Sequence, residues 1–143
     1  MVSEIKVSYE PAIKVKDRMR IHDSQGIYDY VKTIIDNTNL YETMLMLILD
    51  RANAIKGWVK LSQGGMSGTV VDPKIVFSIA LKAAASAIVL IHNHPSGNLK
   101  PSETDIKITE QIKEGGKILD IGVWDHIIIG EDNYYSFADE GKM

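Results

Sequence analysis

The sequence contains no cysteine. Without thiols the chain cannot form a disulfide framework, a cysteine-ligated zinc or iron–sulfur site, or a thiol nucleophile. A zinc deaminase is excluded for the same reason, because that class of enzyme needs a Pro-Cys-x-x-Cys pair to hold its metal. Any metal that this chain binds must therefore use histidine and carboxylate side chains.

A strong charge of one sign and a long apolar run are also missing. The 16 Lys and Arg residues against 19 Asp and Glu residues give a formal net charge of -3, so no overall basic field favours a nucleic-acid partner. The strongest apolar runs, 44–49 and 83–91, are far shorter than the ~20 residues of a membrane span. Residues 1–10 lack the apolar stretch of a secretory signal. These absences predict a cytoplasmic protein with no membrane segment.

The composition that remains is that of an ordinary globular protein. The chain has 143 residues, of which 45% are hydrophobic and 24% are charged. A domain of this size buries roughly two-thirds of the surface of its extended chain, which is enough for one core. We expect residues 23–143 to form this domain and residues 1–22 to form an N-terminal extension.

Strand and helix patterns alternate along the chain. Period-2 alternation and short apolar runs predict strands over residues 4–9, 43–49, 55–61, 86–91, 127–129 and 134–137. Apolar residues at helical spacing, together with cap and turn residues, predict helices from Ser24 until Asn37 breaks the pattern, over 73–85, and from Ser102 to the Gly115–Gly116 pair. Ser24 and Ser102 are the predicted N-caps of the first and third helices, and Asp72 is that of the second. This order predicts an α/β sandwich with a mixed sheet.

The end of the predicted strand 86–91 carries the residues that point to chemistry. His92 and His94 lie two positions apart, so their imidazoles leave the same face while Asn93 points the other way. Two neutral imidazoles side by side are half of a zinc site, and Asp105 follows after a loop that can fold back on them. Three protein ligands leave the fourth position of the metal open to water, as in a catalytic zinc site.

Each of these features has a structural alternative. Two histidines at a strand end are more often a polar edge or a hydrogen-bonded pair, and Ser102 with Asp105 forms a good capping box. The adjacent letters His-Asn-His are not the HNH nuclease motif, whose residues are spread over a larger unit. Asp125 and His126 could support a metal, but a buried hydrogen-bonded pair is the favoured interpretation, and both are left outside the predicted site. Only the joint spacing of the histidines, the serine and the aspartate favours a metal centre.

Longer stretches of the chain resemble a known family. The run HNHPSGNLKPSETD resembles the JAMM signature of the JAB/MPN metalloproteases, and LSQGGMSGTVVDPKIVF, AIVLIHNHPSG and VWDHIIIGEDNYYSF resemble its RadC-like branch. The resemblance implies a three-layer JAB/MPN sandwich of the cytidine-deaminase-like type, with a mixed sheet flanked by helices. Residues 1–40 carry no Gly-rich hairpin, so we expect a short form that lacks the N-terminal helix-hairpin-helix region of full-length RadC proteins.

The resemblance also implies roles for individual residues. His92, His94 and Asp105 would hold Zn²⁺, Glu42 would be the general base and then acid, and Ser102 would stabilise the oxyanion. Glu4, Glu10 and Asp50 are the alternatives to Glu42 as the general base. Asn93 and Ser96 are expected to support the ligand imidazoles.

These roles describe a zinc metallopeptidase that acts on a peptide or isopeptide bond of a protein or peptide substrate. The alternatives are a catalytically silent MPN-type binding or scaffold module and a RadC-like protein associated with DNA repair. An oligomer is compatible with any of the three.

Overall fold

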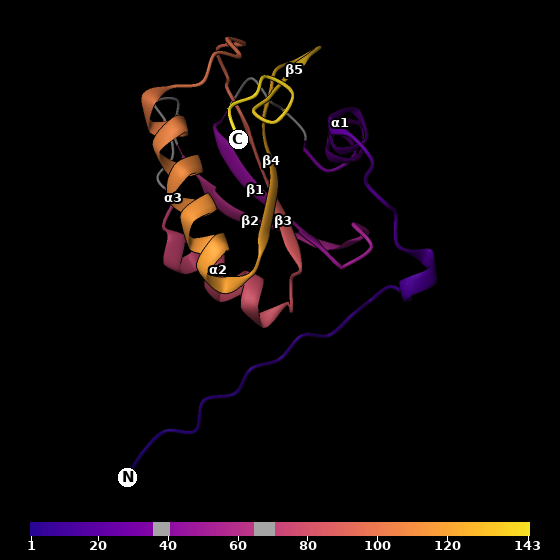
Figure 1. The fold of residues 1–143 in the computed structure, drawn as a ribbon, viewed down its shortest axis with the longest axis vertical. Coiled ribbons are helices and arrows are strands. Elements are labelled where there is room, and N and C mark those ends of the chain that lie inside the picture. The colour runs from indigo at the N-terminus through magenta and orange to yellow at the C-terminus, as the bar shows by residue number, and fades with distance from the viewer. Residues whose placement is uncertain (36–40, 65–70) are drawn as a thin grey trace.

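The computed structural model describes residues 1–35, 41–64 and 71–143, and its centre is a mixed β-sheet with helices on both faces (Figure 1). The elements are the 3-10 helix Val15–Asp17, α1 (Ser24–Lys32), β1 (Thr43–Leu49), β2 (Ile55–Gln63), α2 (Pro73–Lys82), β3 (Ala87–Asn93), α3 (Glu103–Leu119), β4 (Gly122–Ile129) and β5 (Tyr134–Ser136). The α/β class, the mixed sheet and the flanking helices predicted from the sequence are confirmed.

The strand order brings three chain segments to one edge of the sheet. The five strands are ordered β2-β1-β3-β4-β5, and only β3 and β4 are parallel in this sheet of the described residues. Parallel neighbours need a crossover, which α3 provides, so α3 begins beside the C-terminal end of β3 and ends beside the start of β4. Met44 pairs with His92, which places the start of β1 at the same edge.

Both faces of the sheet are buried at the central strands β1 and β3, which explains why β1 is apolar throughout. Leu45, Leu47 and Leu49 pack in the cluster that contains α1, whereas Met44 and Met46 pack in the cluster that contains α2 and α3. Alternation along a strand then decides where a polar residue emerges. His92, the residue before the last of β3, lies on the same face as Leu90. It therefore faces α2 and α3 and contacts Asp105 in the first turn of α3.

The helix caps agree with the sequence at two of three places. Asp72 Oδ1 accepts from the backbone N–H of Lys74, and Ser102 Oγ accepts from the backbone N–H of Asp105, as predicted. The cap of α1 is Asp23 and not Ser24, because Asp23 Oδ1 accepts from the backbone N–H of Gly26 at 2.8 Å. Ser24 is already the first helical residue.

Two further expectations from local pattern are wrong. No strand forms over residues 4–9 among the described residues, and Ile5 is 87% exposed, because an isolated strand has no partner for its backbone groups. The Gly115–Gly116 pair does not end α3, which continues to Leu119. A Cβ at Gly115 would lie 2.5 Å from Phe77 Cε2, so this glycine allows α3 to pack closely on α2.

No helix among the described residues is both long and apolar enough to cross a membrane. The division of the chain at residue 22 stays a prediction.

Candidate metal centre

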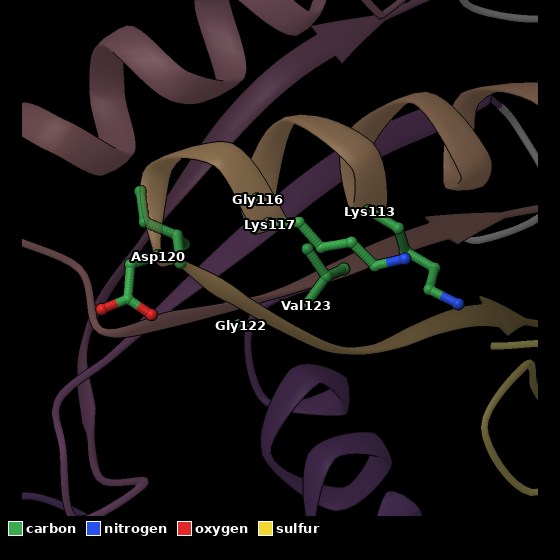
Figure 2. Close-up of a pocket in the computed structure, with 7 residues that line it drawn as sticks. Lys113, Gly116, Lys117, Asp120, Gly122 and Val123 are labelled. Carbon is green, nitrogen blue, oxygen red and sulfur yellow. The ribbon is translucent and has the colours of Figure 1, made fainter.

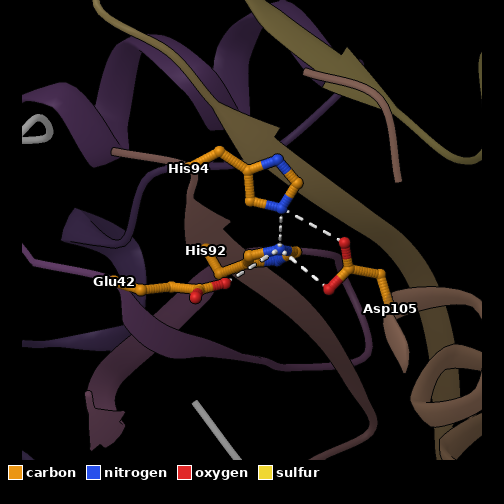
Figure 3. Close-up of side chains that lie close together, drawn as sticks. All are labelled: Glu42, His92, His94 and Asp105. Carbon is orange, nitrogen blue, oxygen red and sulfur yellow. Dashed lines mark hydrogen bonds and ion pairs between the residues drawn. The ribbon is translucent and has the colours of Figure 1, made fainter. Parts of the chain in front are cut away.

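Four side chains that can bind a metal meet at the edge of the sheet where β3 ends (Figure 3). Glu42 lies just before β1, His92 is near the end of β3, His94 follows β3 directly, and Asp105 is in the first turn of α3. One ligand atom from each residue lies within 4.8 Å of all the others. The structure thus brings together the three predicted ligands and the predicted general base.

The distances within this cluster fit a small, four-coordinate ion. His92 Nε2 lies 2.9 Å from His94 Nε2 and 3.1 Å from Asp105 Oδ1, and His94 Nε2 lies 3.1 Å from Asp105 Oδ2. A tetrahedral zinc ion with bonds of about 2.0–2.1 Å separates its ligand atoms by about 3.3 Å, by simple geometry. Imidazole and carboxylate are donors that zinc accepts. The residues present therefore suit such an ion with small adjustments.

The loop after β3 determines the protonation of His94. Its Nδ1 lies 2.6 Å from the backbone carbonyl oxygen of Asn98, which can only accept, so Nδ1 carries a proton. In the neutral ring the Nε2 lone pair then faces the cluster. In the absence of a metal the hydrogen bond with Asp105 outweighs burial and raises the pKa of His94, so that Nε2 readily holds a proton. The site concentrates negative potential at the point where a cation would bind.

A second buried histidine supports His92. His92 Nδ1 lies 2.7 Å from His126 Nε2, and His126 Nδ1 lies 2.5 Å from Thr109 Oγ1. His92 is 1% exposed and His126 is 0% exposed, and burial lowers the pKa of His126 well below its usual value. The sequence interpretation left His126 outside the site and did not consider Thr109. The spacing of Thr109, one turn after Asp105, is a signal in the sequence. The place of His126 is not, because it depends on the parallel pairing of β3 with β4, which puts His126 beside Leu90.

Asp105 belongs both to the N-terminal cap of α3 and to the metal cluster. Its backbone N–H donates to Ser102 Oγ, and its Oδ2 accepts from the Ser102 N–H at 2.8 Å, so both halves of the capping box are present. Its carboxylate also faces both histidines. Burial opposes ionisation of Asp105, but the hydrogen bonds with His92 and His94 outweigh it and hold its pKa well below the usual range. The helix cap thus orients a carboxylate that is ionised at neutral pH.

Three hydrogen bonds hold the backbone around Glu42. The Asn93 side chain accepts from the Thr43 N–H at 2.7 Å and donates to the Tyr41 carbonyl at 2.6 Å, and the Glu42 carbonyl accepts from the Gly64 N–H at 2.8 Å. The Glu42 side chain is 14% exposed, and its Oε1 lies 3.8 Å from His92 Nε2. Asn93 therefore anchors the segment that carries the predicted general base.

The imidazoles have supporting partners other than those expected. The sequence assigned this role to Asn93 and Ser96, whereas the Nδ1 atoms of the two ligand histidines contact His126 and the Asn98 carbonyl. Ser96 acts on the loop, where its Oγ accepts from the Asn98 N–H at 3.3 Å. Asn93 points away from the imidazoles because neighbouring residues on a strand face opposite sides.

Asp125 and His126 are both buried and hydrogen-bonded, as expected, because the His126 backbone N–H donates to Asp125 Oδ1 at 2.7 Å, but their side chains do not pair with each other. They face opposite sides of the sheet, and the Asp125 carboxylate accepts from Ser136 Oγ and the Ala138 N–H on the α1 side. Burial raises the pKa of Asp125. Asp125 joins the C-terminal turn to β4 and lies outside the metal cluster.

A pocket also lies at the opposite end of α3, where the helix ends and β4 begins (Figure 2). It is lined by Lys113, Gly116, Lys117, Asp120, Ile121, Gly122 and Val123, with a volume of about 230 Å³. Its lining includes two lysines and one carboxylate, so it does not offer the donor set of a metal site.

Comparison with known proteins gives a consistent assignment. A family model described as the RadC-like JAB domain matches residues 21–142. A UPF0758 protein of Flavobacterium johnsoniae is 41% identical over 132 residues, which cover 92% of this chain and 56% of the relative. A UPF0758 protein of Porphyromonas gingivalis is 38% identical over 134 residues, which cover 93% and 59%. Another, of Pelobacter propionicus, is 46% identical over 102 residues, covering 71% and 44%. The chain spans roughly half the length of these relatives.

Proposed function

This chain belongs to the RadC-like JAB domain family, and on that premise we propose that it is a zinc-dependent hydrolase that cleaves a peptide or isopeptide bond. The observation that carries the proposal is the convergence of two imidazole Nε2 atoms and two carboxylates within 4.8 Å at one edge of the sheet. The Nδ1 atoms of both imidazoles are already engaged by other groups. The Nε2 lone pairs are thereby directed at a common point.

His92, His94 and Asp105 would hold the metal, and their chemistry fits Zn²⁺. Zinc held by three protein ligands supplies activated water at neutral pH. Two imidazoles are neutral ligands and Asp105 carries one negative charge, so a divalent ion and its three ligands together would keep one positive charge, next to the Glu42 carboxylate. This charge favours a substrate carbonyl oxygen that becomes negative during attack.

Glu42 would move the proton. Its carboxylate lies at the cluster but does not take part in a helix cap, unlike that of Asp105. A carboxylate in this position can accept a proton from the attacking water and deliver it to the leaving amine. The anchored backbone of residues 41–43 keeps the carboxylate within reach of both.

Ser102 would stabilise the developing oxyanion. Its Oγ accepts from the Asp105 N–H at 3.0 Å, and its own hydrogen remains for donation to another group. The side chain is exposed at the start of α3, next to a proposed ligand. A hydroxyl group in this place can serve the helix cap and the reaction at once.

Substitution of the proposed base tests hydrolysis separately from metal binding. The zinc-loaded wild type, Glu42→Gln and Glu103→Gln are incubated with a mixture of unstructured peptides and lysine-linked isopeptides, and new termini are identified by mass spectrometry. Glu103 is exposed in the first turn of α3 and is the matched control. We expect cleavage by the wild type and by Glu103→Gln, and a 10²–10⁴-fold slower reaction with Glu42→Gln at unchanged zinc content, on the order expected for a general base.

Two results would contradict the proposal. Equal turnover by Glu42→Gln would show that another group moves the proton. A wild type that binds zinc but cleaves neither class of bond would favour the alternative of a catalytically silent binding module.

A further inference from the structure

We propose that Thr109 and His126 are positioning residues that hold His92 in the one tautomer able to bind a metal through Nε2. This inference rests on the proposed metal site and adds two residues to it. Thr109, in α3, and His126, in β4, are both buried, and neither is among the four residues of the cluster.

The hydrogen bonds form a chain that begins and ends at proposed metal ligands. Thr109 Oγ1 lies 2.8 Å from the Asp105 carbonyl oxygen and 2.5 Å from His126 Nδ1. His126 Nε2 lies 2.7 Å from His92 Nδ1. The backbone of one ligand is thus connected to the side chain of another through two buried groups.

Counting hydrogens gives this chain a direction. A carbonyl oxygen can only accept, so the single hydroxyl hydrogen of Thr109 points at the carbonyl of Asp105. Thr109 Oγ1 must then accept from His126, which places the ring proton of His126 on Nδ1. In a neutral ring, Nε2 of His126 is an acceptor, so His92 Nδ1 carries the proton that joins them. The lone pair of His92 is left on Nε2, where the other ligands converge.

The surroundings of His126 hold its ring in place. The ring stacks on Phe137 with centroids 4.6 Å apart and planes at 6°. The Phe137 N–H donates to the His126 carbonyl at 3.0 Å, so the stacking partner is attached to the same strand. A neutral ring suits this apolar, fully buried position. In this orientation, His126 Nε2 faces His92 Nδ1 and accepts its hydrogen bond.

Without the Thr109 hydroxyl, the tautomer of His92 should no longer be fixed. The His126 Nδ1–H would lose its acceptor, and the ring could place its proton on Nε2 instead. His92 Nδ1 would then have to accept, which moves the His92 proton to Nε2 and blocks the metal. Supporting groups of this kind are typically worth about 10- to 100-fold in metal affinity.

The test is the zinc dissociation constant of the full chain, measured by competition with a chelating dye. Thr109→Val should weaken zinc binding about 10- to 100-fold relative to the wild type. Thr109→Ser, which keeps the hydroxyl, should bind within about threefold of the wild type. Ile112→Val removes a buried methyl group from the same helix away from the hydrogen-bond chain, and its zinc affinity should not change.

The outcomes separate this inference from the function on which it rests. Equal zinc affinity of Thr109→Val and the wild type would overturn the inference and leave the metal site intact, whereas a wild type that binds no zinc would remove the proposed function and this inference with it. The tautomers can also be measured without any variant, by long-range ¹⁵N–¹H NMR of the imidazoles in the zinc-loaded wild type. We expect His92 and His126 both protonated on Nδ1, and an Nε2–H form of His126 would overturn the inference even if Thr109→Val failed to fold.

Discussion

The two ends of helix α3 put charged side chains to opposite uses. At the N-terminal end, Asp105 is buried, completes the helix cap and faces two histidines. At the C-terminal end, Lys117 and Asp120 are exposed around the pocket of Figure 2, and the helix stops at Asp120 in a left-handed conformation with φ 56°. Only the first end has charged and polar groups whose orientation is set by several hydrogen bonds each.

The contrast shows that a hollow in the surface is a weaker functional signal than buried, ordered donor atoms. Exposed lysines and carboxylates are solvated and cost little free energy of folding. Buried ionisable groups lower the free energy of unfolding unless they are paired. A cluster of buried, paired ionisable groups therefore indicates a functional site. Changes at the N-terminal end should therefore alter metal binding, and changes at the C-terminal end should alter stability alone.

The largest effect is expected from Asp105→Ala. The variant loses a proposed ligand and half of the capping box, so we expect zinc affinity to fall by more than about 100-fold and the free energy of unfolding by about 1 kcal/mol. Elemental analysis gives the zinc content and urea titration the stability. Glu103→Ala, in the same turn, should keep its zinc, and zinc retained by Asp105→Ala would contradict the ligand assignment.

Ser102 separates capping from catalysis. Loss of the cap alone in Ser102→Ala should cost about 1 kcal/mol of stability, whereas loss of an oxyanion donor should lower kcat by about 10²–10³. Ser102→Asp should restore the cap but not the activity, because a carboxylate cannot donate to a developing negative charge. Melting temperatures and turnover numbers of both variants decide the point, and an active Ser102→Asp protein would leave Ser102 as a cap only.

Gly116→Ala tests the other end of the helix. The added Cβ would lie 2.4 Å from the backbone oxygen of Ile121, so the connection between α3 and β4 must move. We expect about 1–3 kcal/mol lower stability from this overpacking, measured by urea unfolding of the zinc-free protein. Zinc affinity should stay within about twofold of the wild type, and a parallel loss of affinity would show that the two ends are coupled.

The smallest effect is a pH dependence of stabilisation by zinc. The hydrogen bond with Asp105 raises the pKa of His94 in the metal-free fold. This proton stabilises the metal-free protein fully below the unfolded pKa of about 6.5, and its contribution is lost as pH rises through the folded-state pKa. Zinc must displace the same proton from Nε2, so the rise in Tm caused by zinc should be larger at pH 8 than at pH 6. A rise that is equal or larger at pH 6 would contradict this competition.

Local spacing was sufficient to predict three of the four residues of the cluster. His92 and His94 lie on one strand end, and Ser102 and Asp105 share one helix turn, so their relative placement follows from strand and helix geometry. Glu42 came from resemblance and not from spacing, since its segment is held at the site by the hydrogen bond between Thr43 and Asn93, which are 50 positions apart in the sequence. The apolar runs of the buried strands were equally local signals.

What the sequence could not give depends on contacts between distant segments. The role of His126 needs the parallel register of β3 and β4, which joins residues 34 positions apart. The Gly115–Gly116 pair suggested a helix end, because nothing local reveals that Phe77 packs against it. The alternating residues 4–9 suggested a strand, because the pattern cannot supply a pairing partner.

Zinc stoichiometry of the wild-type chain tests the central claim most directly. Metal is removed from the purified protein with a chelator, micromolar Zn²⁺ is added, and the mass is measured by native mass spectrometry. The His94→Ala variant is treated in the same way for comparison. The arrangement of Glu42, His92, His94 and Asp105 predicts about one zinc ion per wild-type chain and little or none in the variant. A wild type that takes up no zinc under these conditions would contradict the account.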